Sequence, residues 1–309
     1  MKLNKKSISI GAKGFCMGMA DIVPGVSGGT VALITGIYDE LIKSISLVNT
    51  DFIKLLFQFK IIKALEHINI KFLAPLMLGI LTAIVSMARL MHFFMNNYSV
   101  YTWSLFFGLI LASIIFVAKH IEDIKKLNHL SFIILGTAIG YGVVSLIPVE
   151  TSNTLSMIFF SGMISICAMI LPGISGSFIL LILGKYMYVT SAIKNPFIEG
   201  NIYILISFAF GCLLGLLAFS RLLNYLLSKF HGQMMCVLLG FMIGSLKKIW
   251  PWREVIEQKI IRGKVHVLKE SVVFPTEVNL EVILAFGLMI FGIVLVFVIE
   301  GFSKQKASD

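Results

Sequence analysis

Long apolar stretches separated by short polar ones dominate the chain. Six stretches are continuous enough for a helix of roughly 20 residues that crosses the hydrocarbon layer, at 72–95, 99–118, 130–148, 202–227, 233–250 and 282–299. Two further apolar segments, 8–38 and 155–186, are about 30 residues long, and each contains a Pro-Gly pair near its middle. We interpret both as re-entrant hairpins of two half-helices, since broken backbone at membrane depth is tolerated only where protein or water satisfies it.

The two interrupted segments repeat one motif. The sequence Pro24-Gly25-Val26-Ser27-Gly28 recurs 148 residues later as Pro172-Gly173-Ile174-Ser175-Gly176, and Gly36 and Tyr38 recur as Gly184 and Tyr186. At an offset of 132, a second set returns: Gly79, Arg89, Gly108 and Ser113 match Gly211, Arg221, Gly240 and Ser245. We therefore expect a duplicated all-α polytopic membrane protein, in a single domain over 1–309. Its repeats cover about 8–120 and 155–250, with a linking span at 130–148 and a final span at 282–299.

Three spans separate the two hairpins, so the second hairpin enters from the opposite side and the repeats are inverted. On the amino-terminal side the loops and both termini carry 16 Lys and Arg, against 9 on the other side. This excess predicts cytoplasmic amino and carboxyl termini. The loop 247–280 weakens the contrast, because it holds 7 of the basic residues on the other side.

Composition supports a membrane protein. Hydrophobic residues make up 58% and charged residues 14% of the 309 positions, which excludes a soluble domain of this size. The net charge is +10, and no nucleic acid partner is expected. The four cysteines lie in apolar segments without paired spacing, so we expect neither a metal nor a disulfide, and no cofactor.

The first repeat has 16 extra residues, within 39–71. In that segment apolar residues stand at helical spacing with lysines between them: Phe52, Leu55, Leu56, Phe59 and Ile62, with Lys54, Lys60 and Lys63. The pattern favours a helix on the cytoplasmic surface that is attracted to anionic lipid. An ordinary loop helix packed on the bundle fits the pattern equally well.

The repeated motif predicts an anion site. Glycines allow close approach of the backbone, and Ser27 and Ser175 are suitable helix caps. Free amides and the positive dipole end of a helix favour an anion. The expected phosphate contacts are Ser27, Gly28, Gly29 and Thr30 in the first copy and Ser175, Gly176 and Ser177 in the second. The alternative is that these residues only cap and pack the hairpins.

Arg89 and Arg221 occupy matching positions inside two spans. A charge at the centre of a span costs on the order of 2.5–3.5 kcal/mol, so a paired arginine suggests a role. Guanidinium binds phosphate through two hydrogen bonds, and we expect both residues to hold the anion. Extension of each side chain to the headgroups is the alternative.

Asp21 breaks the symmetry, since its counterpart is Met169. A carboxylate in apolar surroundings can exchange a proton, so Asp21 is the candidate for proton coupling. The alternative is a permanently ionised Asp21 paired with Lys13 or with an arginine.

The segment Asp21-Ile-Val-Pro-Gly-Val-Ser-Gly-Gly-Thr30, followed by Gly36-Ile-Tyr38, resembles the signature of a bacterial membrane family associated with undecaprenyl-phosphate translocation. The resemblance covers essentially the whole chain, including Leu171-Pro-Gly-Ile-Ser-Gly176. It implies a flippase of the bacterial cytoplasmic membrane, with a polyprenyl-phosphate lipid as its substrate. The carrier would return from the outer to the cytoplasmic leaflet for reuse in cell-wall synthesis.

Two other functions stay open. Undecaprenyl-pyrophosphate phosphatases carry a similar Pro-Gly-x-Ser turn, but an arginine follows the serine there, where this chain has Gly28 and Gly176. The only Glu-x-x-x-Glu, at Glu277 and Glu281, lies far along the chain, so an enzyme is not expected. A transporter of a small soluble anion would use the same hairpins. The oligomeric state is not predicted.

Overall fold

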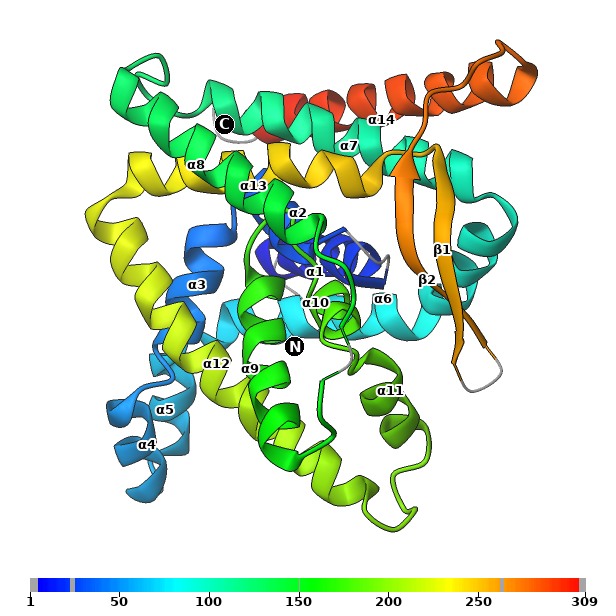
Figure 1. The fold of residues 1–309 in the computed structure, drawn as a ribbon. Coiled ribbons are helices and arrows are strands. Elements are labelled where there is room, and N and C mark those ends of the chain that lie inside the picture. Colours follow the sequence, from blue (N-terminus) through cyan, green and yellow to red (C-terminus); the bar gives the residue numbers. More distant parts are fainter. Residues whose placement is uncertain (1–4, 23–25, 150, 262–263, 306–309) are drawn as a thin grey trace.

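The computed structural model describes residues 5–22, 26–149, 151–261 and 264–305, and Figure 1 shows their arrangement. Helices form most of this part of the chain. Their bounds are α1 Lys5–Ile22, α2 Gly28–Ile34, α3 Tyr38–Ser46, α4 Thr50–Phe57, α5 Ile61–His67, α6 Ile70–Asn97, α7 Ser99–Lys119, α8 Leu127–Val144, α9 Leu155–Ile170, α10 Gly176–Ile182, α11 Tyr186–Lys194, α12 Asn201–Lys229, α13 His231–Ile249 and α14 Leu280–Gln305.

The six expected spans are confirmed as long apolar helices. In the described residues, α6, α7, α8, α12, α13 and α14 are each long and apolar enough to cross a membrane. Their lipid-facing surfaces are rich in exposed aliphatic and aromatic side chains, such as Val85 on α6 and Ile290 on α14. A soluble protein would bury such side chains, whereas a bilayer solvates them.

The two interrupted segments have the same local architecture. Each consists of a long helix, a break and a seven-residue helix, followed by a third helix of nine residues, in α1–α2–α3 and α9–α10–α11. The turns after α2 and α10 depend on Gly36 and Gly184, whose φ angles are +68° and +67°. A side chain would strain both turns, which explains why the sequence repeats these two glycines. Between α10 and α11 the helix axis bends by 116°.

Helix packing is also repeated. Extensive contacts join α1 to α6 in the first half and, in the second half, α9 to α12. Close approach is possible because Gly79 and Gly211 stand at the crossings. A Cβ atom at Gly79 would lie 2.1 Å from the Gly11 carbonyl oxygen, and one at Gly211 would lie 2.0 Å from that of Phe159. Small residues at helix crossings are typical of membrane bundles.

The remaining spans pack across the halves. Helix α8 lies along α13, and α14 lies along α7, as Figure 1 shows. Gly108 and Gly240 again occupy the crossings, where a Cβ atom would lie 2.0 Å and 2.4 Å from the carbonyl oxygens of Met289 and Ile133. The α6–α7 corner and the α12–α13 corner lie at opposite ends of the molecule (Figure 1), as inverted repeats require.

The main buried core joins both halves of the chain. It lies where the hairpins meet the long helices, and it includes Ile42, Leu76, Ile170, Leu223 and Met242.

A two-stranded antiparallel sheet, which the sequence analysis did not predict, connects α13 to α14. Strands β1 Arg253–Ile261 and β2 Lys264–Val272 stand at the same end as the α6–α7 corner (Figure 1). We call this pair the β-ribbon. The sequence analysis treated 247–280 as a loop between two spans, and the structure shows that this loop contains the two strands. Alternation in Lys264-Val265-His266-Val267, preceded by Gly263, is a hairpin signal in the sequence.

Residues 39–71 form two short helices, α4 and α5, in addition to α3. The turn between α4 and α5 contains Phe59, which has a φ of +53° and is 88% exposed. No residue of α4 is buried, and Ala64 alone is buried in α5. The exposed apolar side chains favour the surface helix over a helix packed on the bundle, while its contact with anionic lipid stays a prediction.

Substitution of Gly211 by alanine tests the close helix crossing. Because the added Cβ would meet backbone atoms of α9, which cannot move alone, we expect Gly211→Ala to cost about 1–3 kcal/mol despite the helix preference of alanine. Gly142→Ala is the matched control, since nothing lies within 4 Å of its Cβ position. Thermal unfolding in detergent should show a lower Tm for the first variant and no loss for the second. Equal Tm values would contradict the crossing.

Candidate functional site

The two helix breaks meet each other inside the protein. The Ser27 hydroxyl donates to the carbonyl oxygens of Met169 and Leu171 at 3.3 and 3.2 Å. The backbone N–H of Gly173 donates to Thr30 Oγ1 at 2.9 Å. Side chains of the first hairpin thus satisfy backbone groups at the break of the second. Pro24 and Gly25 of the first motif lie outside the described residues.

Asp21 closes the first hairpin on itself. Its Oδ1 accepts the backbone N–H of Gly28 at 2.7 Å, where α2 begins. A Cβ atom at Gly28 would lie 2.5 Å from the Asp21 carboxylate, and one at Gly29 would lie 2.5 Å from the Ile170 carbonyl oxygen. Lys13 donates instead to the Thr35 carbonyl at 2.7 Å, so it is not the partner of Asp21. Both glycines are required by close packing.

The second hairpin presents its hydroxyls differently. Ser175 Oγ and Ser177 Oγ lie 2.8 Å apart and share a hydrogen bond. Gly176 is buried against the Ser165 carbonyl oxygen, 2.7 Å from its Cβ position. Ser177 is half-buried and faces a cavity. Of the seven motif residues that were expected to contact phosphate, Ser177 is the one that lines this cavity.

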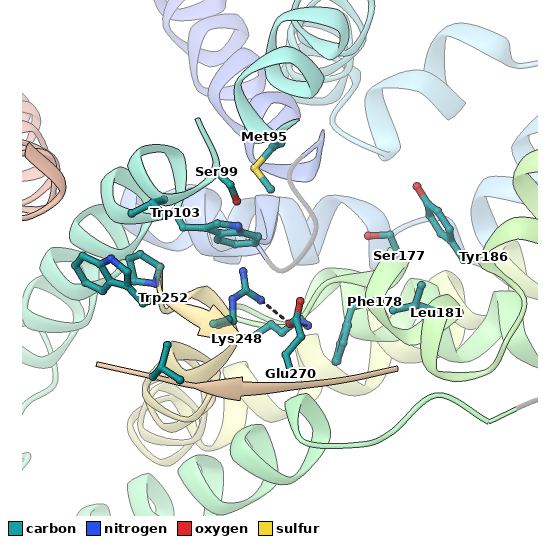
Figure 2. A pocket seen from close by; sticks show the side chains of 14 residues that line it. Met95, Ser99, Trp103, Ser177, Phe178, Leu181, Tyr186, Lys248, Trp252 and Glu270 are labelled. Atoms are coloured by element: carbon teal, nitrogen blue, oxygen red, sulfur yellow. Dashed lines mark hydrogen bonds and ion pairs between the residues drawn. The ribbon is translucent and has the colours of Figure 1, made fainter. Parts of the chain in front are cut away.

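The cavity has a volume of about 580 Å³ and lies at the β-ribbon end of the molecule, with its lining side chains drawn in Figure 2. Helix α10 contributes Ser177, Phe178 and Leu181 to one wall. The end of α6, the start of α7 and the start of α11 form further parts of the wall. Lys248 at the end of α13 and the β-ribbon complete the lining.

The charged side chains of the cavity form one cluster (Figure 2). Glu270 Oε2 lies 3.3 Å from Lys248 Nζ and 3.0 Å from Arg253 Nη1. The side chains of Lys248 and Arg253 are 24% and 12% exposed. Two cations thus face one carboxylate, which leaves one positive charge for an anion to balance. Burial raises the pKa of Glu270, but both cations outweigh it and hold that pKa below the ordinary 4.5.

Aromatic rings surround this cluster. The Arg253 guanidinium lies 4.5 Å from the centre of the Trp103 ring, and Lys248 Nζ lies 4.8 Å from that of Phe178. Trp250 and Trp252 contact each other, with ring centres 5.6 Å apart. Such aromatic groups are enriched where a membrane protein meets the interface. The cavity therefore combines cations, a hydroxyl and an aromatic belt.

Arg89 and Arg221 are not brought together. Arg89 stands on α6, eight residues before its end at the α6–α7 corner, and Arg221 stands on α12, eight residues before the α12–α13 corner. Those corners are at opposite ends of the molecule (Figure 1). Arg221 Nη2 donates to the Val48 carbonyl at 2.7 Å. Both side chains are exposed, and neither lines the cavity.

Sequence reasoning missed Lys248, Arg253 and Glu270. They are separated along the chain and have no spacing that predicts a shared site, because β2 carries Glu270 back to β1. The usable signal was the seven basic residues of 247–280, which stand next to Trp250 and Trp252. Basic residues interleaved with aromatic ones in a loop between two spans indicate an interfacial anion site.

Acid should loosen the β-ribbon. The Glu270 pKa is lowered in the folded protein, so the ion pairs are fully present above the ordinary carboxyl value of 4.5 and are lost as the pH falls through the lower folded value. All three tryptophans of the chain lie in or beside this cluster, so their fluorescence reports on it. We expect constant emission between about pH 8 and about pH 5, and a change below that range. Glu270→Gln should lack this change; an identical transition in that variant would contradict the assignment.

Comparison with known proteins places this geometry in a family. The profile of the undecaprenyl phosphate translocase-like family matches residues 17–266. A polyprenyl-phosphate transporter of Vibrio cholerae is 44% identical over 248 residues, which cover 80% of this chain and 79% of the relative. A polyprenyl-phosphate transporter of Staphylococcus aureus is 32% identical over 254 residues, covering 77% and 84%. No solved structure matches. The chain belongs to the undecaprenyl phosphate translocase-like family.

Proposed function

We propose that this protein carries polyprenyl phosphate across the bacterial cytoplasmic membrane, from the outer to the cytoplasmic leaflet. The observation that supports this most directly is the cation pair of the cavity, in a chain whose relatives are named polyprenyl-phosphate transporters. The β-ribbon end faces outward in this proposal, and both termini are cytoplasmic, as the distribution of basic residues predicts. The headgroup then enters the cavity from the outer leaflet.

The charge of the cavity suits a phosphate monoester. Such a group carries about 1.5 to 2 negative charges at neutral pH, and the cluster of Lys248, Arg253 and Glu270 carries a net +1. Arg253 can offer two parallel N–H groups, while Lys248 acts as a point charge. Phosphate would replace Glu270 as their partner, and Ser177 would add a hydroxyl donor from α10.

The protein does not need to enclose the apolar polyprenyl tail. The aromatic side chains around the cavity support a position at the depth where headgroups meet hydrocarbon. The polyprenyl chain would then remain in the bilayer while the phosphate enters. Only the headgroup must then be shielded on its way across. In this proposal the path of the headgroup is lined by the hairpin residues Ser27 to Thr30 and Ser175 to Ser177. Their small side chains let the backbone approach the phosphate.

Inward movement of an anion opposes an inside-negative potential by about 2.3 kcal/mol per charge per 100 mV. A proton that moves with the phosphate would offset this cost. Asp21 is the proposed carrier, because its carboxylate sits at the break of the first hairpin and lacks a cationic partner among the described residues.

The cavity cations can be tested in cells. Depletion of the protein should leave polyprenyl phosphate exposed on the outer surface, where an impermeant probe labels it. Wild-type protein should reverse this accumulation, whereas Lys248→Ala and Arg253→Ala should reduce recycling by at least about tenfold, because each removes a charge-assisted contact.

Lys247→Ala is the matched control, since Lys247 donates to Ser145 and lies over the Tyr141 ring, away from the cavity. No accumulation on depletion would refute the proposed function. Release of inorganic phosphate from the pyrophosphate lipid by the purified protein would identify a phosphatase instead, and uptake of a water-soluble anion would identify a small-anion transporter.

Substitution of Asp21 tests the coupling. Asn retains an oxygen that accepts the Gly28 N–H, so Asp21→Asn should fold normally but lose the dependence of transport on pH. Without the compensating proton, an inside-negative potential should slow inward transport by the variant more than by the wild type. The measurement is lipid flipping in proteoliposomes at several pH values and imposed potentials. If the variant responds to both as the wild type does, Asp21 is not the proton carrier.

A further inference from the structure

The two repeats make different contacts at the two ends of the molecule. At the cytoplasmic end α3 packs along α12. The copies of these helices are α11 and α6, and they make no comparable contact in the described part of the chain. The cavity lies between them instead, lined by Tyr186 at the start of α11 and Met95 near the end of α6. The packing of α3 on α12 closes the cytoplasmic end, whereas the opposite end lacks the corresponding contact and is open at the cavity.

The arginine pair follows the same division. Arg221 on α12 donates to the carbonyl of Val48, which lies two residues beyond the end of α3. Its copy Arg89, on α6, has no hydrogen bond, ion pair or ring contact with any other described residue. The position that corresponds to Val48 in the second repeat is Pro196, two residues beyond the end of α11. Since proline keeps its backbone carbonyl, the acceptor exists in both repeats, but only one is in use.

The repeated tyrosines agree with the arginines. The hydroxyl of buried Tyr38 donates to the Ile170 carbonyl at 3.3 Å and so ties α3 to the second hairpin. Its copy Tyr186 lines the cavity, and its hydroxyl has no hydrogen-bond partner within the described ranges. The carbonyl that corresponds to Ile170 belongs to Ile22. Arg221 and Tyr38 therefore form hydrogen bonds at the closed end, where α3 packs along α12. Within the described residues, the side chains of their copies Arg89 and Tyr186 form none at the open end, where the cavity lies.

We propose that the protein has a second conformation in which these contacts are exchanged between the repeats. Helix α11 packs onto α6, Arg89 donates to the carbonyl of Pro196, and Tyr186 donates to that of Ile22. At the other end, Arg221 releases Val48 and Tyr38 releases Ile170. Arg89 and Arg221 are then positioning residues, each of which holds one end closed, and neither needs to touch the phosphate.

The exchange is consistent with elementary energetics. Because the two halves share helix lengths, glycine turns and donor positions, the two conformations form similar sets of contacts and differ little in free energy. In each conformation one of the two arginines forms a hydrogen bond and the other forms none. The inference rests on the proposed function in two respects: the β-ribbon end faces outward, and closure over the cavity would carry a bound headgroup inward.

Accessibility of the cavity tests the exchange. Val100 lines the cavity, so Val100→Cys can be labelled from outside the cell with a membrane-impermeant maleimide, and the parent chain with its four native cysteines gives the background. Arg89→Ala should raise labelling, because it removes a contact of the outward-closed conformation. Arg221→Ala should lower it. A hydrogen bond to a charged group makes roughly a tenfold change in the ratio of the two conformations, and Arg89→Lys, which keeps a donor, should restore much of it.

Cross-linking gives a second measurement that does not depend on labelling rates. At the closed end His231 Nε2 lies 3.3 Å from Asp39 Oδ2, and the corresponding positions at the open end are Ser99 and Met187. A short bis-maleimide should link Ser99→Cys to Met187→Cys more readily when Arg221→Ala is also present. Unchanged labelling in both arginine variants, a shift in the same direction, or no such increase in cross-linking would overturn the inference.

These outcomes are separable from the proposed function, since neither measurement requires a lipid substrate. If labelling and cross-linking shift as expected but depletion exposes no carrier lipid, the exchange stands and the substrate is wrong. If recycling depends on Arg253 while neither measurement shifts, the substrate stands and the exchange is refuted.

Discussion

The structure depends on the matching of two broken helices inside apolar surroundings. A helix break leaves backbone groups unpaired, and in hydrocarbon no water can satisfy them. Here the carbonyl oxygens of 169–171 accept hydrogen bonds from the Ser27 and Tyr38 hydroxyls, while Thr30 accepts the Gly173 amide. Neither hairpin is complete alone. The glycine crossings of α1 with α6 and α9 with α12 hold the two breaks against each other.

Charge does not share the symmetry of this scaffold. Arg253 and Glu270 come from the β-ribbon, which is inserted between α13 and α14 and has no copy between α7 and α8. One end of the molecule therefore receives a buried ion cluster with an aromatic surround, while the other end is held by a backbone carbonyl and an exposed Asp39–His231 pair. The similar helices of the two halves form the scaffold, and the β-ribbon contributes two of the three charged residues of the cluster.

The sequence allowed the spans, the hairpins and the repeat offsets to be predicted, because apolar length and the recurrence of Gly and Pro are local properties. The interaction between Ser27 and the second hairpin could not be predicted, since it joins residues that are more than 140 positions apart. The cluster of Lys248 and Glu270 was hidden for the same reason, because a tertiary turn brings them together. The difference between Arg89 and Arg221 could not be predicted either. Identical residues in a repeat predict identical contacts, but in this conformation only Arg221 forms its hydrogen bond.

The crossed packing of the last helices has a consequence for how the chain is made. Helix α8 needs α13, and α7 needs α14, which comes much later in the chain. The glycine face of α7 around Gly108 therefore lacks its packing partner until α14 has been synthesised. The first repeat thus cannot complete its helix packing on its own. The two halves thus fold as one cooperative unit. If the chain were divided between them, each half would lack helices that it packs against and would not form a small transporter on its own.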